Sequence, residues 1–168
     1  MPRQPPIEYM ARTRAYYTAL GYPPYQWAHH ETTPFHRPAR ALSETRIALV
    51  TTAAPFDPAH GDQGAHAPYN AAAKFYRVYE CPVRPAPDLR ISHLGYDRVH
   101  THAADPNTWL PLAALEAAAA DGRIGALAER LVGLPTDRSQ RATLERDAPD
   151  VLAACRRMEV DAALLVPT

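Results

Sequence analysis

Two short apolar runs constrain the fold more than any other feature of the sequence. Residues 46–52 are RIALVTT, and residues 160–168 are VDAALLVPT. Continuous apolar, β-branched runs of this length are typical of buried strands in a parallel sheet. The second run follows an acidic residue and meets Pro167, as expected of a buried strand arriving at the rim of a sheet. In open α/β folds, the rim at the carboxyl ends of the strands is where ligands bind.

Helical segments are expected between these strands. Residues 7–20 carry apolar side chains near helical spacing and end at Gly21 and Pro23, which predicts an amphipathic N-terminal helix. A second helix is expected from Asp105 or Asn107, with Pro111 in its first turn, to Gly122. Further helical segments are expected over 124–132 and 149–158, and short strands over 75–80 and 89–95.

This alternation of strands and helices predicts the α/β class, with a parallel sheet and helices on both of its faces. The expected arrangement is a Rossmann-like or flavodoxin-like three-layer fold that is incomplete at its C-terminus, with a poorly covered final strand. We expect one domain over 1–168. An N-terminal helix and proline-rich coil would occupy 1–45, and the sheet-containing core would occupy 46–168.

Charge and cysteine content exclude several classes of partner. Lys and Arg number 18, as do Asp and Glu, so the formal net charge is zero and neither nucleic acid nor a membrane surface is expected. No apolar run approaches the ~20 residues needed to span a bilayer. Two scattered cysteines give no disulfide framework, and no signal peptide is visible, so we expect a cytoplasmic protein.

The densest group of polar side chains lies between Ser92 and Asn107, where a predicted strand leaves the sheet. It contains Ser92, His93, Asp97, His100, His102, Asp105 and Asn107. Three interpretations stay open for this stretch. Imidazoles and carboxylates could bind a divalent metal, or they could bind substrate and move protons near neutral pH. Alternatively, the polar side chains only cap a helix and bond their own backbone.

Other chemically reactive residues give weaker signals. The loop 55–66 follows the strand 46–52 and contains Asp62, so its position favours a ligand loop, although it lacks both P-loop and dinucleotide-binding spacing. The histidines of residues 29–36 are expected to be solvated coil. Cys81 has no neighbouring base in the sequence, and Cys155 lies on the apolar face of a predicted helix, which indicates a core thiol.

Several stretches, taken in order, resemble one known family. They are YMARTRAYYTALGYPPYQW, LSETRIALVTTAA, GD at 61–62, FYRV at 75–78, DLRISHLGYD, DPNTWLPLAALEAAAADGRIGALA and VDAALLVPT. Together they are similar to the selenoprotein B family of the glycine, sarcosine, betaine and D-proline reductases. The likeness covers nearly the whole chain. It is weakest in the loop 53–74, and within RLVGLPTDRS it holds only at Gly133.

The resemblance implies that the strand ending at Thr168 is followed directly by a selenocysteine or cysteine. That selenol or thiol would be the nucleophile in the reductive cleavage of a substrate C–N bond. This chain would then carry no cofactor of its own, and selenocysteine would be expected in its full-length relatives. The implied partners are an amino-acid-like small molecule, other reductase subunits or a thioredoxin-type electron donor, and a homo-oligomer is an open possibility.

Within this framework His93 and Asp97 are the predicted catalytic residues, placed to orient the substrate or to move a proton. Ser92, Asp105, Asn107 and Asp62 are the predicted substrate-binding residues. Two alternatives stay open. One is a non-catalytic partner or small-molecule-binding subunit of the same fold. The other is a metal-dependent hydrolase or lyase that uses the loop from His93 to Asp105.

Overall fold

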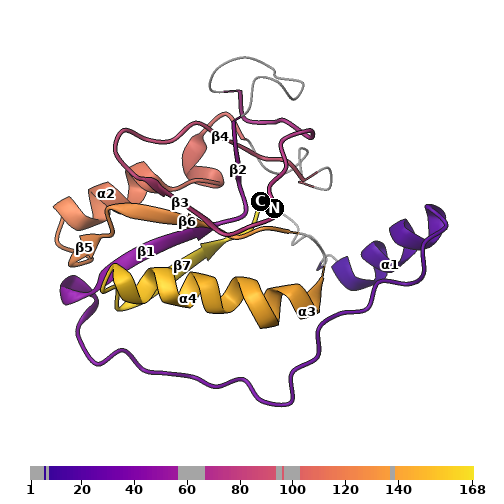
Figure 1. The fold of residues 1–168 in the computed structure, drawn as a ribbon, viewed down its shortest axis with the longest axis horizontal. Coiled ribbons are helices and arrows are strands. Elements are labelled where there is room, and N and C mark those ends of the chain that lie inside the picture. Colours follow the sequence, from indigo (N-terminus) through magenta and orange to yellow (C-terminus); the bar gives the residue numbers. More distant parts are fainter. Residues whose placement is uncertain (1–5, 7, 57–66, 94–95, 97–102, 137–138) are drawn as a thin grey trace. The chain divides into compact units, whose positions relative to one another are not determined.

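The computed structural model describes residues 6, 8–56, 67–93, 96, 103–136 and 139–168. The chain divides into two compact units, Met1–Phe35 and His36–Thr168. Figure 1 labels the elements of both units.

The first unit is a helix followed by an extended segment. Helix α1 spans Tyr9–Ala19 and ends with Gly21 at φ +76°, which confirms the predicted N-terminal helix and its glycine stop. None of its described residues is buried, so the apolar stripe expected from the sequence is not covered within this unit. The ring of Tyr25 lies 5.4 Å from that of Tyr17 and 4.8 Å from that of Trp27, so aromatic contacts hold the extended segment against the helix.

The second unit is built on a mostly parallel sheet with β1 (Arg46–Thr51) at its centre (Figure 1). Strand β7 (Ala162–Val166) runs parallel along one side of β1, in register from Ile47 with Ala162 to Thr51 with Val166. Strands β5 (Ala126–Leu127) and β6 (Arg130–Gly133) follow one another along its other side. Strand β3 (Tyr79–Pro82) pairs antiparallel with β6. The apolar runs at 46–52 and 160–168 are therefore both strands, as predicted.

A second, two-stranded sheet extends from the end of β1. It pairs β2 (Ala54–Pro55) antiparallel with β4 (Leu89–Arg90). The strand predicted over 89–95 is shorter than expected, and the strand predicted over 75–80 is shifted to Tyr79–Pro82. The fold is thus a mixed α/β structure. Its main sheet is mostly parallel, as expected, and β3 is the strand that departs from this by running antiparallel.

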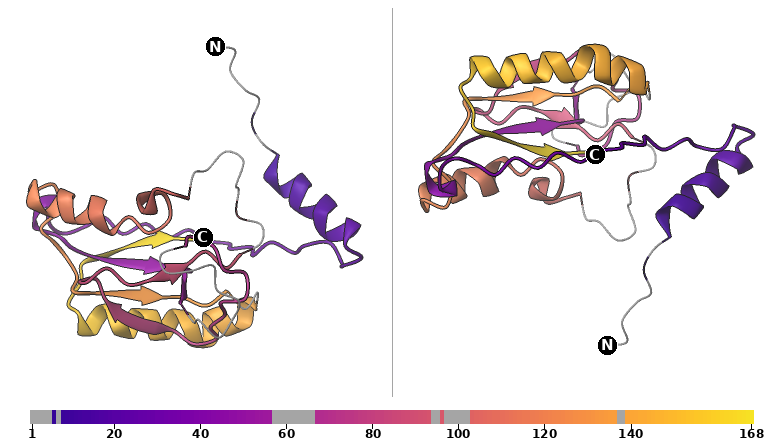
Figure 2. Two further views of the ribbon diagram at one scale, coloured as in Figure 1. Left: turned by 90° about the horizontal axis from the view of Figure 1, so that it is seen from above. Right: turned by 90° about the horizontal axis from the view of Figure 1, so that it is seen from below.

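Helices cover parts of both faces of the main sheet, as the edge-on views of Figure 2 show. On one face, α4 (Ala148–Arg157) packs Ala154 against Val50 of β1 and Val132 of β6. On the other, Leu112 of α2 (Leu112–Ala120) belongs to the apolar cluster of Leu49 and Leu131. Shorter helical segments complete the unit: η1 (Leu42–Glu44), η2 (Pro106–Thr108), α3 (Gln140–Ala142) and the π-helical η3 (Thr143–Asp147). Among the described residues, no helix combines the length and apolarity that crossing a membrane requires.

Two local predictions are corrected here. The segment 124–132 is not helical, because it forms β5 and β6 against the central strand. Its alanines and leucines favour a helix locally, but pairing along β1 buries Leu131 and Val132 completely, and this tertiary burial overrides local propensity. Strand β7 is not fully buried, which corrects the expectation of a buried run and agrees with the expectation of a poorly covered final strand. It is an edge strand of the described sheet, and Leu164 and Leu165 are 41% and 63% exposed.

Candidate active site

The carboxyl ends of β1 and β7 meet at one rim of the sheet, where paired threonines hold them together. The backbone N–H of Thr168 donates a 2.8 Å hydrogen bond to Oγ1 of Thr52, and the two threonine hydroxyls lie 3.1 Å apart. The N–H of Thr52 in turn donates to the carbonyl of Val166. These bonds prolong the β1–β7 ladder past the last residues of both strands. The rim therefore fixes the position of the chain at Thr168.

Tyr79 stabilises the same rim from the opposite side of β1. Its hydroxyl donates a 2.7 Å hydrogen bond to the carbonyl of Ala53, a residue with no solvent exposure. Its ring lies directly over Gly133 in the neighbouring strand, where any Cβ would overlap the ring. Burial raises the pKa of the phenol far above its usual range, and nearby Cys81 adds to the rise. Tyr79 is therefore a neutral donor that holds the backbone leaving β1.

The small sheet directs Ser92 and His93 toward this rim. Arg90 of β4 pairs with Ala54, which lies two residues after Thr52, and β4 runs antiparallel to β2, back toward the end of β1. Ser92 is buried and His93 is exposed. The topology thus brings two of the predicted site residues to the same end of the sheet as Thr52. It leaves the His93 imidazole accessible to a ligand.

A buried arginine supports this approach of β4. Arg90 has no exposed surface, forms an ion pair with Asp88, and stacks its guanidinium 4.4 Å from the ring centre of Phe56. The stacking ties the two strands of the small sheet together. Arg90 therefore has a structural role in positioning Ser92 and His93.

Asp105 and Asn107 act as caps. Oδ1 of Asp105 accepts a 3.0 Å hydrogen bond from the N–H of Asn107 at the start of η2. Oδ1 of Asn107 accepts a 3.1 Å hydrogen bond from the N–H of Ala114 in the first turn of α2. Asn107 therefore satisfies a backbone donor in the first turn of α2, as predicted for Asp105 or Asn107, whereas Asp105 caps the separate short helix η2. Their predicted contact with substrate stays a prediction.

The remaining predicted site residues, Asp62, Asp97, His100 and His102, lie outside the described residues. Within the described parts of the chain, no three His, Cys, Asp or Glu side chains gather in a way that could hold a metal ion. Most of the loop proposed as a metal site lies outside the described residues. The metal-dependent alternative therefore stays a hypothesis.

Neither thiol of this chain is activated as a nucleophile. Burial raises the pKa of Cys81, and the charge of Arg130 only partly opposes this rise. Burial also raises the pKa of Cys155, and the carboxylate of Glu80 adds to it. Both thiols therefore remain protonated near neutral pH, whereas a nucleophilic cysteine needs a lowered pKa. Cys155 is only half-buried and lines a groove, so the fully enclosed thiol expected from the sequence is not what the structure shows.

The sequence interpretation missed three residues of the rim: Thr52, Tyr79 and Gly133. One signal was available, because Gly133 is the one position of RLVGLPTDRS that keeps the family resemblance. The structure supplies a reason for glycine there, namely the close packing of the Tyr79 ring. No local pattern links Thr52 with Thr168, since 116 residues separate them.

A family model matches most of the chain. The model of the family described as "Glycine/sarcosine/betaine reductase selenoprotein B (GRDB)" matches residues 21–168. Neither the curated proteins nor the solved structures contain a significant match to the chain. The matched region includes the whole second unit, with both strands of the rim.

Proposed function

The chain belongs to the glycine/sarcosine/betaine reductase selenoprotein B family, and from this membership we propose that it forms the part of a reductase subunit that presents a selenol or thiol nucleophile at the rim of the sheet. The nucleophile would be the residue directly after Thr168 in the full-length protein. The reaction would be the reductive cleavage of a C–N bond in an amino-acid-like substrate. A thioredoxin-type dithiol would supply the two electrons, and other reductase subunits would be its partners, in the cytoplasm. Two observations support this proposal. One is the family match over residues 21–168, and the other is the hydrogen bond that holds the end of the chain segment at Thr168 against Thr52.

The rim has properties that such a nucleophile requires. A nucleophile must be held in one place and still be reached by substrate. The hydrogen bond from the Thr168 N–H to Thr52 holds Thr168 at the carboxyl end of the central strand, so a nucleophile that followed it would lie at the rim. Tyr79 restrains the backbone on the opposite side of β1 through the Ala53 carbonyl. A selenol is ionised at neutral pH, as a low-pKa thiol is, and so supplies a nucleophile without a separate base.

His93 is the described side chain best placed to assist. It is exposed, and it follows the small sheet that leads back to the rim. An imidazole titrates near neutral pH, so it can donate a proton to the departing amine. Asp97, four residues later in the sequence, would orient that imidazole. The completed sheet would be Rossmann-like, with helices on both faces.

The test is the mass and selenium content of the native protein, purified from its own organism grown with selenium. We expect a mass well above 18.5 kDa and one selenium per chain. A native mass of 18.5 kDa without selenium would contradict the proposal and favour a non-catalytic subunit. With the long form in hand, His93→Gln should lower the rate of substrate cleavage about 100-fold, within the range of general acid–base catalysis. His36→Gln, a change at another exposed histidine, serves as the matched control.

A further inference from the structure

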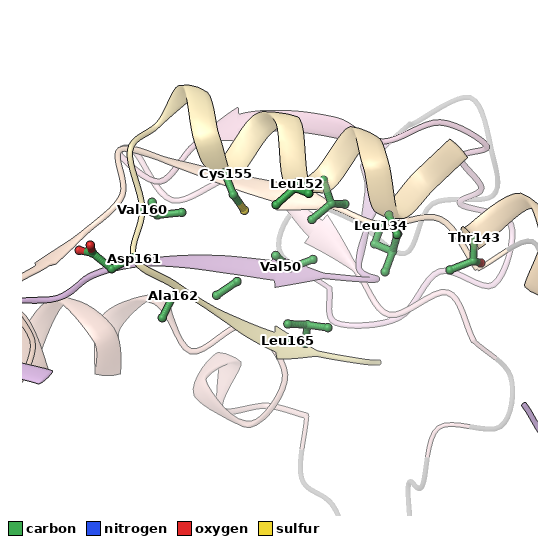
Figure 3. Close-up of a pocket in the computed structure, with 12 residues that line it drawn as sticks. Val50, Leu134, Thr143, Leu152, Cys155, Val160, Asp161, Ala162 and Leu165 are labelled. Carbon is green, nitrogen blue, oxygen red and sulfur yellow. The ribbon is translucent and has the colours of Figure 1, made fainter. Parts of the chain in front are cut away.

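An apolar groove runs beside α4 on the face of the sheet that this helix covers (Figure 3). Its volume is about 340 Å³. Val151, Leu152 and Cys155 line it from α4, and Ala163 and Leu165 line it from β7. Leu152 is 49% exposed and Leu165 is 63% exposed. Two leucines with this much exposed surface, one on α4 and one on β7, indicate a surface that another segment normally covers.

The groove borders β7, whose outer edge pairs with no other strand among the described residues. The N–H of Thr52 donates to the carbonyl of Val166, so Val166 turns its backbone toward β1. Backbone groups of alternate residues point to opposite sides of a strand. Ala163 and Leu165 therefore direct their N–H and carbonyl groups away from β1, toward the edge where the described sheet has no further strand. No charged side chain interrupts Ala162–Val166 to protect this edge.

The spacing between strands and between packed helices predicts what fills the groove. Strands lie about 4.8 Å apart and packed helices about 8–10 Å apart, so neighbouring helices in one layer are separated by roughly two strands. Helix α4 packs on Val50 and Val132, above the β1–β6 pair. The next helix in that layer therefore belongs above β7 and one further strand.

The handedness of crossover connections between parallel strands predicts the same position for this helix. The segment α3–η3–α4 connects β6 to β7 by crossing over β1, so the chain steps across the sheet in one direction. Connections between parallel strands are right-handed. A further step in the same direction, from β7 to a strand beyond it, must place its helix on the same face as α4. That face holds the groove.

We propose that the groove is the seat of an amphipathic helix, and that this helix joins β7 to a further parallel strand paired along its free edge. The occupant is the polypeptide that continues past Thr168, so this inference rests on the proposed function. Thr168 lies at the carboxyl end of β7, which is where a crossover helix begins before running back along the strand. The helix would present aliphatic side chains to Leu152 and Leu165.

A second copy of the chain fits this surface poorly. Pairing two β7 edges about a two-fold axis would separate the two α4 helices by four strand spacings, roughly 19 Å. That is about twice the distance at which helices pack. Both grooves would remain open, and the exposed leucines would stay in water.

The test compares residues 1–168 with the longer protein, in which cysteine replaces the residue after Thr168 and translation runs to the next stop codon. Hydrogen exchange of the Ala163 and Leu165 amides should slow at least 100-fold in the longer protein. The Leu164 amide, which faces β1, is the internal reference. Equal exchange of Ala163 and Leu165 in both proteins would overturn the proposal. So would protection in 1–168 that grows with protein concentration, because that result indicates a second copy.

A substitution pair tests the groove within the longer protein alone, even if residues 1–168 do not fold in isolation. Leu165→Asp should restore fast exchange at Ala163, whereas Leu144→Asp should not. Leu144 is 64% exposed but does not line the groove. Slow exchange that survives Leu165→Asp refutes the helix seat. A protected edge without reductive activity contradicts the proposed function only. Activity with an unprotected edge contradicts this inference only.

Discussion

Replacing Gly133 with alanine should destabilise the rim through its contact with Tyr79. The new Cβ would overlap the Tyr79 ring, which leans over β6 from the adjacent strand. Forcing a methyl group into such a contact costs about 1–3 kcal/mol. A displaced ring would also withdraw the hydroxyl from the Ala53 carbonyl, and a buried acceptor left without its donor costs about 1 kcal/mol more. The expected loss is roughly 2–4 kcal/mol in the free energy of unfolding.

Urea unfolding of four proteins measures this loss: the wild type, Gly133→Ala, Tyr79→Ala and the double variant. Because the methyl group clashes only with the ring, Gly133→Ala should cost less than about 0.5 kcal/mol once the ring is absent, which gives a coupling energy of about 2 kcal/mol. Tyr79→Phe keeps the ring and removes only the hydroxyl, so in that background Gly133→Ala should remain costly. A Gly133→Ala protein as stable as the wild type refutes the reasoning. An equal loss with and without the Tyr79 ring refutes it as well.

Four further outcomes are expected. Glu159 has a left-handed φ of +52° just after α4, so Glu159→Gly should raise the free energy of unfolding by about 1 kcal/mol. Glu159→Ala should give no gain, and thermal unfolding of the two variants measures the difference. Thr52→Val removes the hydroxyl that holds Thr168, so it should cost about 1 kcal/mol and speed amide exchange at Thr168, while Thr52→Ser should behave like the wild type. Cys81 and Cys155 have raised thiol pKa values, so alkylation at pH 7 should be slow and should accelerate as the pH rises past the usual thiol range; fast labelling at pH 7 would contradict the burial. Burial of these protonated thiols also contributes stability below the ordinary thiol pKa that is lost as the pH rises, so urea midpoints should fall at alkaline pH, and Cys81→Ala should reduce that fall.

The strands and helices with strong local signals could be predicted from the sequence. The run RIALVTT becomes β1, and the final run becomes β7. Pro111 directly precedes the first residue of α2, and Gly122 follows the helix at a positive φ of 68°. In each of these segments, the local residue preferences and the tertiary structure agree.

The segment 124–132 shows where local signals fail. Ala126, Leu127 and Ala128 favour a helix when considered alone, yet this stretch lies beside the central strand. Gly125 makes the approach possible, because a Cβ there would come within 2.6 Å of the Glu44 carbonyl carbon. That contact depends on residues some 80 positions apart in the chain, since Arg46 pairs with Ala126. It is invisible to any local pattern.

In the candidate site too, contacts between residues near in the chain could be predicted and contacts between distant residues could not. Asp105 and Asn107 could be predicted as caps, because their bonds are made within a few residues. The polar stretch from Ser92 was correctly expected to follow a strand. The pairing of Thr52 with Thr168 and of Tyr79 with Ala53 depends on strand order, which the sequence alone did not specify.

The position of β7 in the chain also determines the order of assembly during synthesis. Arg46 contacts Asp161 across 115 residues, so the central strand leaves the ribosome long before its neighbour exists. The β3–β6–β1 part of the sheet can form first, but the side of β1 that pairs with β7 stays open until β7 clears the exit tunnel. Contacts between distant parts of a chain form slowly, and translation adds about 5–20 residues each second. The two threonines of the rim are 116 residues apart in the chain, so their hydrogen bond forms only after β7 has left the exit tunnel.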